Sequence, residues 1–196
     1  MLVFWKQRLV FLATPKTGTT AVESALESLA SVVIQRPPAL KHTPVRRYRR
    51  FLAPYLQSAA AEDFTVVAMM REPIDWLGSW YRYRTREAIA ETARSTAAMS
   101  FDDFVQGYLQ RPQPDYADIG NQSRFLDGGE GPGVDRIFRY EAIGDFVRFL
   151  EDRLDCEINL PRLNVSPAGS TVLSPATEAR LRADCAADFA LYQGLG

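Results

Sequence analysis

The sequence predicts an α/β protein with three layers, in which helices cover both faces of a mostly parallel central sheet. Short apolar segments of strand type recur along the chain, and helical patterns lie between them. Strand followed by helix followed by strand favours parallel neighbours joined by right-handed crossovers. The chain has 196 residues, of which 46% are hydrophobic, and this suits one domain with a sizeable core. We therefore expect a single α/β/α domain over residues 1–196.

Four segments are typical of buried strands, because each is short, rich in branched or aromatic side chains and bounded by turn or helix signals. They are residues 9–13 (LVFLA), 31–34 (SVVI), 64–70 (FTVVAMM) and 134–139 (VDRIFR). The first segment leads into a hydroxyl-rich turn, so we expect a P-loop-like phosphate-binding turn after the first strand.

Helices are predicted between these strands. After the first turn, apolar residues recur at positions i, i+3, i+4 and i+7, which predicts one buried helical stripe. The stripe consists of Val22, Ala25, Leu26 and Leu29. Glu23 falls outside it, so we expect Glu23 to face solvent. Other helix starts show a hydroxyl N-cap followed by proline or by an acid three residues on: Thr43 with Pro44, Ser100 with Asp103, and Ser174 with Pro175. Residues 111–120 and 127–133 are expected to be loops.

The charge and cysteine content limit the class of partner. With 23 basic and 24 acidic residues the formal net charge is −1, so no net field favours nucleic acid or an anionic membrane. Apolar runs fall short of the ~20 residues that span a bilayer, and no signal-peptide pattern is seen. We expect a cytoplasmic protein with neither partner. Cys156 and Cys185 lack metal-ligand spacing and are expected to be buried thiols.

The stretch FLATPKTGTT (residues 11–20) runs from an apolar strand through a turn into a helix. Unsatisfied backbone N–H groups and the positive end of the helix dipole meet there, an arrangement that attracts phosphate or sulfate. Glycine allows close backbone approach, lysine adds charge, and threonine hydroxyls can donate hydrogen bonds. The residues concerned are Lys16, Thr17, Gly18, Thr19 and Thr20. The alternative is a threonine-capped connection with a solvated lysine.

A second segment, VVAMMREPIDWLGSWYRY (residues 66–83), also passes from an apolar strand into a helix. Arg71 stands at the carboxyl end of this strand, the sheet edge at which open α/β sheets bind ligands. Arginine suits bidentate phosphate binding, and Ser79 could add a hydroxyl from the helix. The alternative is an arginine paired with Glu72 or Asp75 at the helix start.

Together the two segments resemble the two cofactor motifs of the sulfotransferase family, whose members transfer a sulfuryl group from 3′-phosphoadenosine 5′-phosphosulfate (PAPS) to an acceptor. PKTGTT is similar to the family's 5′-phosphosulfate loop. Arg71-Glu72-Pro73 followed by Ser79 is similar to its 3′-phosphate motif, except that asparagine or aspartate is more usual at position 72. The resemblance implies that Lys16, Thr17, Gly18, Thr19 and Thr20 hold the 5′-phosphosulfate and that Arg71 and Ser79 hold the 3′-phosphate. Residues 121–126 (NQSRFL), 139–141 (RYE) and 188–192 (DFALY) more weakly resemble the branch with many carbohydrate sulfotransferases.

Sulfuryl transfer needs charge stabilisation on the leaving oxygen and a base for the acceptor proton. Lys16 can neutralise the charge that develops on the bridging oxygen. His42 is the only histidine; if Thr43 caps a helix that begins at Pro44, the positive dipole end favours a neutral imidazole. Lys41-His42 also resembles a KH element of this branch, in which a histidine or glutamate is the base. The alternative is a solvated loop histidine. The fallback bases are Glu23 and Glu72.

Three further groups of residues are weaker candidates for a functional role. The basic cluster Arg46, Arg47, Arg49 and Arg50 is expected to be a solvated helix face opposite Val45, Tyr48, Leu52 and Tyr55. The aromatic residues Trp76, Trp80, Tyr81 and Tyr83 are expected to pack in the core. A C-terminal segment with Arg162, Asn164 and Ser166 is a candidate for closing over the nucleotide, as in some relatives.

The predicted activity is PAPS-dependent sulfuryl transfer to a hydroxyl or amine of a small molecule or carbohydrate, without a metal ion. Two alternatives stay open. A nucleotide-binding module would bind the cofactor without turnover, and a P-loop kinase would use ATP and magnesium. The kinase loop GxxxxGK[ST] is absent, because the lysine here precedes the only glycine of the turn. The identity of the acceptor depends on loops whose conformations the sequence does not fix.

Overall fold

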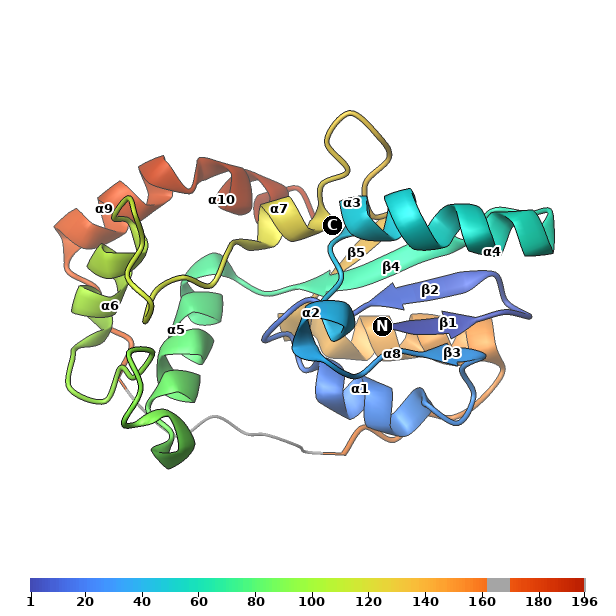
Figure 1. Ribbon diagram of the computed structural model, residues 1–196, viewed down its shortest axis with the longest axis horizontal. Helices are drawn as coiled ribbons and strands as arrows, with labels where there is room; N and C mark the ends of the chain where they lie inside the picture. The colour runs from blue at the N-terminus through green and yellow to red at the C-terminus, as the bar shows by residue number, and fades with distance from the viewer. Residues whose placement is uncertain (162–169, 196) are drawn as a thin grey trace. The chain divides into compact units, whose positions relative to one another are not determined.

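The computed structural model describes residues 1–161 and 170–195, which form an α/β fold with a five-stranded mixed sheet (Figure 1). The strand order is β3-β1-β2-β4-β5. The strands are β1 (Leu2–Phe4), β2 (Leu9–Leu12), β3 (Val32–Val33), β4 (Thr65–Met70) and β5 (Arg136–Arg139). Strands are thus present within all four predicted segments, and the predicted α/β class is confirmed.

Of the four strand pairings, β2 with β4 and β4 with β5 are parallel, whereas β1 pairs antiparallel with both β2 and β3. The sequence analysis did not predict β1. Its three apolar residues are followed by a turn at residues 5–8, so that β1 and β2 form a hairpin with Val3 opposite Val10. This hairpin is the reason that the sheet is mixed.

Two compact units make up the described chain. Unit 1 contains residues 1–71, 122–161 and 195, and therefore the whole sheet; unit 2 contains residues 72–121 and 170–194. The expectation of one domain over residues 1–196 stays a prediction.

The main core of unit 1 lies between the sheet and two helices, α1 (Thr19–Leu26) and α8 (Ile143–Leu154), which lie on the same side of the sheet in Figure 1. Phe11, Val22, Met69 and Phe146 belong to this cluster, and the rings of Phe11 and Phe146 lie 5.3 Å apart. The other helices of unit 1 are α2 (Pro38–Lys41), α3 (Val45–Arg47), the π-helix η1 (Tyr48–Leu52), α4 (Ala53–Ala60), α7 (Gln122–Leu126) and the 3-10 helix η3 (Tyr140–Ala142).

The helical stripe after the first turn is only partly as predicted. Val22 and Leu26 are buried, but α1 ends at Leu26, so Leu29 falls beyond the helix and is 51% exposed. The residues of β3 are also exposed rather than buried, because this two-residue strand forms the edge of the sheet.

The segment α3–η1–α4 carries the basic cluster, and Arg46, Arg47 and Arg50 are exposed as predicted. Arg49 is half-buried instead, because its guanidinium pairs with Asp135 at 3.0 Å. Tyr55 was expected on the buried side but is 72% exposed, and Leu56 is buried instead. The π-helical turn η1 contains more residues per turn than an α-helix. This change of phase rotates the following residues, so that the buried position shifts by one along the chain.

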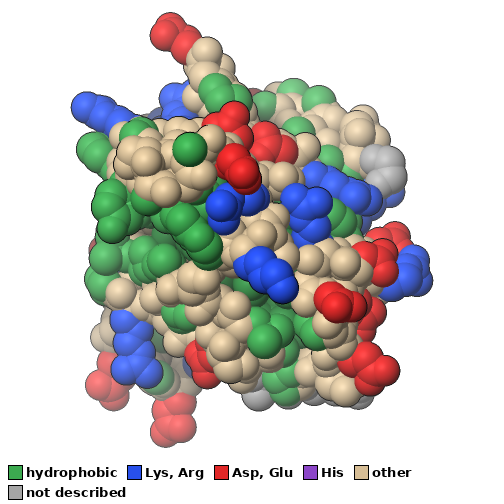
Figure 2. Space-filling view, turned by 90° about the vertical axis from the view of Figure 1, so that its right-hand side faces the viewer, with side chains coloured by type: hydrophobic (Ala, Val, Ile, Leu, Met, Phe, Trp, Pro, Cys, Tyr) green, Lys and Arg blue, Asp and Glu red, His purple; other side chains and the backbone are tan. Residues whose placement is uncertain are grey.

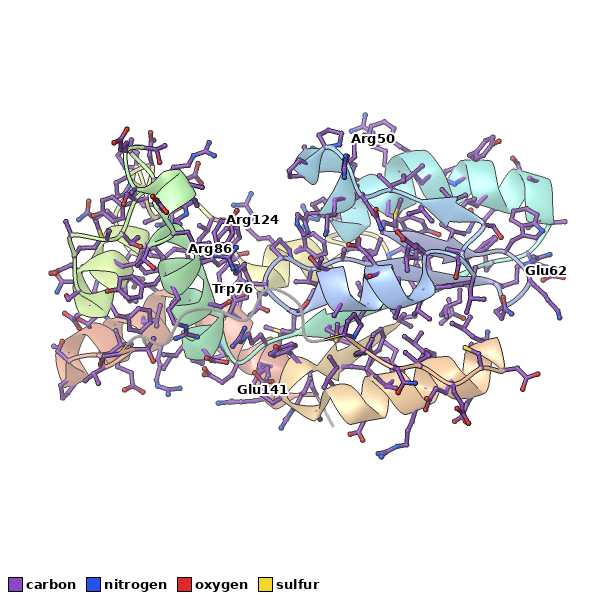
Figure 3. The ribbon with its side chains drawn as sticks, turned by 90° about the horizontal axis from the view of Figure 1, so that it is seen from below. Arg50, Glu62, Trp76, Arg86, Arg124 and Glu141 are labelled. Atoms are coloured by element: carbon purple, nitrogen blue, oxygen red, sulfur yellow. The ribbon has the colours of Figure 1, made fainter. Side chains whose placement is uncertain are left out.

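Surface charges of both signs are interspersed in unit 1. Arg8, in the turn between β1 and β2, pairs with Glu62 beyond α4 at 3.0 Å, and Glu62 is labelled in Figure 3. The face of the molecule in Figure 2 carries basic and acidic side chains among apolar ones. This mixture agrees with the net charge of −1.

Unit 2 is helical and has its own core. Its helices are α5 (Pro73–Arg84), the 3-10 helix η2 (Glu87–Ile89), α6 (Phe101–Tyr108), α9 (Pro175–Asp184) and α10 (Ala186–Gln193). Trp76 belongs to its hydrophobic cluster, and Trp80 and Tyr81 pack against it, as predicted. Ser100 forms the predicted capping box with Asp103. The predicted cap of α9 is confirmed too, since the Ser174 side chain accepts a hydrogen bond from a backbone N–H of its first turn.

Each helix in residues 1–161 and 170–195 is too short or too polar to cross a bilayer. Over the same residues, His, Cys, Asp and Glu side chains form no group of three or more that could hold a metal ion. Cys156 and Cys185 are free thiols, and both are half-buried rather than buried as predicted.

Candidate anion-binding site

The turn after β2 leaves the start of α1 open to an anion. Gly18 is the N-cap residue, with a φ of 70° in the left-handed region that favours glycine. Among the described residues no side chain caps α1, and its first turn contains no acidic residue. In the described part of the chain, neither a side-chain cap nor an acidic residue of the first turn therefore neutralises the positive end of the helix dipole.

Two buried threonines of this turn differ in how their hydroxyl groups are used. Thr17 is buried, and its Oγ1 donates a hydrogen bond to the carbonyl oxygen of Thr14 at 3.0 Å. The hydroxyl proton of Thr17 is thus used within the turn, so any donation to an anion must come from its backbone. Thr14 is also buried, and its Oγ1 has no hydrogen-bond partner in the part of the chain that the structure describes. The sequence analysis did not identify Thr14, although it is one more hydroxyl beside the lysine.

The other two predicted threonines differ in environment. Thr19, the first residue of α1, is buried. Thr20 is exposed, and its Oγ1 accepts a hydrogen bond from the Nζ atom of Lys41 at 3.3 Å. The Lys41 ammonium group therefore lies beside the first turn of α1 as well.

Arg71 reaches the same turn from the end of β4. Its Nη1 atom donates a hydrogen bond to the carbonyl oxygen of Lys16 at 3.3 Å. Lys16 itself has a φ of 65°, an uncommon left-handed conformation for a residue other than glycine. Both predicted cationic residues thus belong to unit 1, and the guanidinium of one contacts the backbone of the other.

Gln122 fixes the backbone of Arg71 on its other side. The Gln122 Oε1 atom accepts from the Arg71 N–H at 2.9 Å, while its Nε2 atom donates to the Arg71 carbonyl oxygen at 2.8 Å. The side chain is buried, so these two bonds satisfy both main-chain groups of Arg71 at once. Sequence reasoning noticed this residue only within the segment NQSRFL and gave it no role.

His42 is close to the start of the turn. Its Nδ1 atom lies 2.7 Å from the carbonyl oxygen of Ala13. Because a carbonyl can only accept, Nδ1 carries the proton and Nε2 is the basic nitrogen of the neutral ring. Burial lowers the pKa of His42 from its ordinary value of 6.5, and the hydrogen bond to Ala13 opposes this shift only in part.

The lowered pKa favours a neutral His42, as predicted, but the predicted cause is wrong. Thr43 does not cap α3; its Oγ1 donates to the carbonyl oxygen of Leu40 at 2.6 Å, and the N-cap residue of α3 is Pro44. His42 instead follows the last residue of α2. Desolvation, rather than a positive dipole end, therefore favours the uncharged imidazole.

Glu23 was expected to face solvent but is buried in α1, at 1% exposure. Its Oε2 atom pairs with the Nζ atom of Lys41 at 2.6 Å, and its Oε1 atom accepts from the α-amino group of Met1 at 3.0 Å. A buried carboxylate needs such partners. Glu23 is thus an anchor for the Lys41–His42 segment, which makes it a poor candidate for the base.

Two predicted residues lie in unit 2. Glu72, the second fallback base, is the N-cap of α5, where its Oε2 atom accepts from the N–H of Asp75 at 2.8 Å. Burial raises the pKa of Glu72. Ser79 is buried within α5; its role toward a 3′-phosphate stays a prediction. Arg162, Asn164 and Ser166 lie outside the described residues.

A hollow of about 820 Å³ lies at the carboxyl end of α8 in unit 1. Its lining includes the four acidic residues Glu151, Asp152, Asp155 and Glu157. Carboxylates repel a phosphate or sulfate group. The turn before α1 therefore suits an anion better than this hollow does.

Comparisons of the chain with protein-family models, with curated proteins and with solved structures gave no match.

Proposed function

We propose that this chain is a sulfotransferase that uses PAPS, with a three-layer α/β/α arrangement around its sheet. The observation that carries this proposal is the approach of Arg71 to Lys16, within hydrogen-bond distance of the turn that precedes an uncapped helix. One anion-binding region with two basic residues is what an adenosine cofactor with phosphate groups at both ends of its ribose would require.

The residues of the turn fit the 5′-phosphosulfate of PAPS. The start of α1 offers backbone donors, and the buried Thr14 hydroxyl lacks a partner among the described residues. Lys16, Gly18 and Thr19 would hold the phosphosulfate, while Arg71 would hold the 3′-phosphate. When bound, PAPS would supply the sulfuryl group that is transferred. The two cations supply the positive charge, so the proposal needs no metal ion.

His42 is the proposed base. Its Nδ1 proton is held by Ala13, so Nε2 is free to accept a proton from the hydroxyl or amine of the acceptor. The lowered pKa of His42 keeps the imidazole neutral at pH 7, as a base must be. Lys16 is proposed to stabilise the negative charge that develops on the leaving oxygen. The acceptor is proposed to be a small molecule or a carbohydrate.

Calorimetric titration tests the nucleotide half of this proposal. We expect wild-type protein to bind 3′-phosphoadenosine 5′-phosphate more tightly than adenosine 5′-phosphate. Arg71→Ala should lose this preference, by about tenfold to a hundredfold, as expected for a charge-assisted hydrogen bond of about 1.5–3 kcal/mol. Lys16→Ala should weaken both nucleotides. Arg50→Ala, which removes an exposed arginine of η1 (Figure 3), is the matched control and should change neither.

A screen of acceptors with PAPS tests the catalytic half. We expect sulfation of some acceptor, with turnover lost in His42→Ala while nucleotide binding is kept. Binding without turnover for any acceptor would identify a nucleotide-binding module instead. Equal affinity of the wild type for the two nucleotides would refute the assignment of Arg71 and, with it, the proposed function.

A further inference from the structure

The ring of Tyr140 contacts both parts of the anion-binding site. The guanidinium carbon of Arg71 lies 4.6 Å from the ring centroid, within the range of a cation–π interaction. The ring is also close to the turn, since a Cβ atom at Gly18 would lie only 2.9 Å from the Cε2 atom of Tyr140. The ring can approach the turn this closely because position 18 is glycine.

Two features of the fold place Tyr140 at this point. It is the first residue of η3 and follows β5 directly, and β5 neighbours β4, which carries Arg71 at its end. The next residue, Glu141, is exposed near the start of α8 (Figure 3). Parallel strands bring their carboxyl ends to one edge, so Tyr140 and Arg71 meet there.

We propose that Tyr140 is a positioning residue for Arg71, an inference that rests on the proposed function. Arg71 is then held before any ligand binds by Gln122 at its backbone, Lys16 at one edge of the guanidinium and Tyr140 at its face. A free arginine side chain loses much rotamer freedom when it binds a phosphate. Ordering it in advance lowers this cost and strengthens the recognition of the 3′-phosphate.

The test compares the ratio of affinities for 3′-phosphoadenosine 5′-phosphate and adenosine 5′-phosphate. Tyr140→Leu should reduce this ratio by about twofold to thirtyfold, the range that a cation–π contact spans. Tyr140→Phe keeps the ring and should keep the ratio. The matched control is Phe51→Leu, which removes a second cation–π contact of unit 1, between Arg50 and Phe51 at 5.1 Å on η1. It should leave the ratio unchanged.

A double-mutant cycle separates positioning from a merely structural role. If Tyr140 acts through Arg71, then Tyr140→Leu has no further effect on the ratio in an Arg71→Ala background. A loss of equal size in both backgrounds would overturn the inference. If Tyr140→Leu does not fold, phenylalanine analogues of increasing fluorination at position 140 keep the shape of the ring while weakening the cation–π attraction. The ratio should then fall with each fluorine, and a constant ratio would contradict the proposal.

The two proposals fail in different ways. Wild-type protein that does not distinguish the nucleotides would refute the proposed function itself. A wild-type preference that is unchanged in Tyr140→Leu would refute the role of Tyr140 alone.

Discussion

Gln122 gives the sharpest test of how the site is built. The side chain is 1% exposed and makes two hydrogen bonds to the backbone of a single residue, Arg71. Gln122→Leu keeps a side chain of similar volume but removes both polar groups. The N–H and carbonyl groups of Arg71 would then lose their partners.

The structure sets the size of the effect. A buried polar group that loses its partner costs about 1–3 kcal/mol. Two groups are affected, but Arg71 is half-buried, so water can reach part of its backbone. We therefore expect the free energy of unfolding to fall by about 2–3 kcal/mol, near the lower end for two such groups. For a chain of this size that corresponds to a decrease of about 4–12 °C in Tm.

Urea unfolding followed by circular dichroism measures this loss. Gln35→Leu is the matched control, because it removes one exposed hydrogen bond to Glu27 and should change the free energy of unfolding by less than about 0.5 kcal/mol. Gln122→Leu should also lower the preference for the 3′-phosphorylated nucleotide, since Arg71 would no longer be fixed. If both glutamine variants were equally stable and kept this preference, Gln122 would have no role in positioning Arg71.

Three further predictions concern the same unit. An NMR titration of His42, the only histidine in the sequence, should give a pKa below 6.5, and a pKa at or above 6.5 would contradict this prediction. The free energy of unfolding should fall as the pH drops from 6.5 towards the lower pKa of the folded protein, because the unfolded chain binds the proton first. Glu23→Ala should lower the free energy of unfolding in urea by about 3–5 kcal/mol, because it leaves the buried α-amino group of Met1 and the half-buried Lys41 without their carboxylate. A loss below about 1 kcal/mol would show that the pairing is not needed. Gly18→Ala should lower the free energy of unfolding by at least about 1–2 kcal/mol because of the left-handed φ at this position. It should also weaken nucleotide binding, since the new methyl group would meet the Tyr140 ring. In the control Gly144→Ala the new Cβ has nothing within 4 Å, so this variant should not be destabilised.

Local signals predicted much of the fold. The capping box of Ser100 and the cap at Ser174 involve residues within one helical turn, so the sequence contains all that is needed to recognise them. Strands β2 and β4 lie in short apolar runs that lead into polar residues, and their carboxyl ends were expected to carry the site. Where the phase of a helix changes, as at η1, periodicity alone placed Tyr55 on the wrong side.

The residues that complete the site were harder to predict, because their roles depend on contacts across long stretches of chain. Gln122 lies 51 residues from Arg71 in sequence. The ion pair of Glu23 with Lys41 likewise joins residues 18 apart, one in α1 and the other in α2. A charged residue outside an apolar stripe is normally solvated. Only the fold shows that the Lys41 ammonium group pairs with Glu23.

The electrostatics of unit 1 explain how a nearly neutral chain could hold a strongly charged anion. Glu23 is one turn along α1 from the anion-binding turn, and an unpaired carboxylate at that position would repel phosphate. Lys41 neutralises it at 2.6 Å and extends to Thr20, so no uncompensated negative charge remains in the first turns of α1. The partial positive charge of the helix start then adds to that of Lys16 and Arg71. Since exposed charges are screened within about 8–10 Å in salt, the local arrangement and not the net charge of −1 determines what binds there.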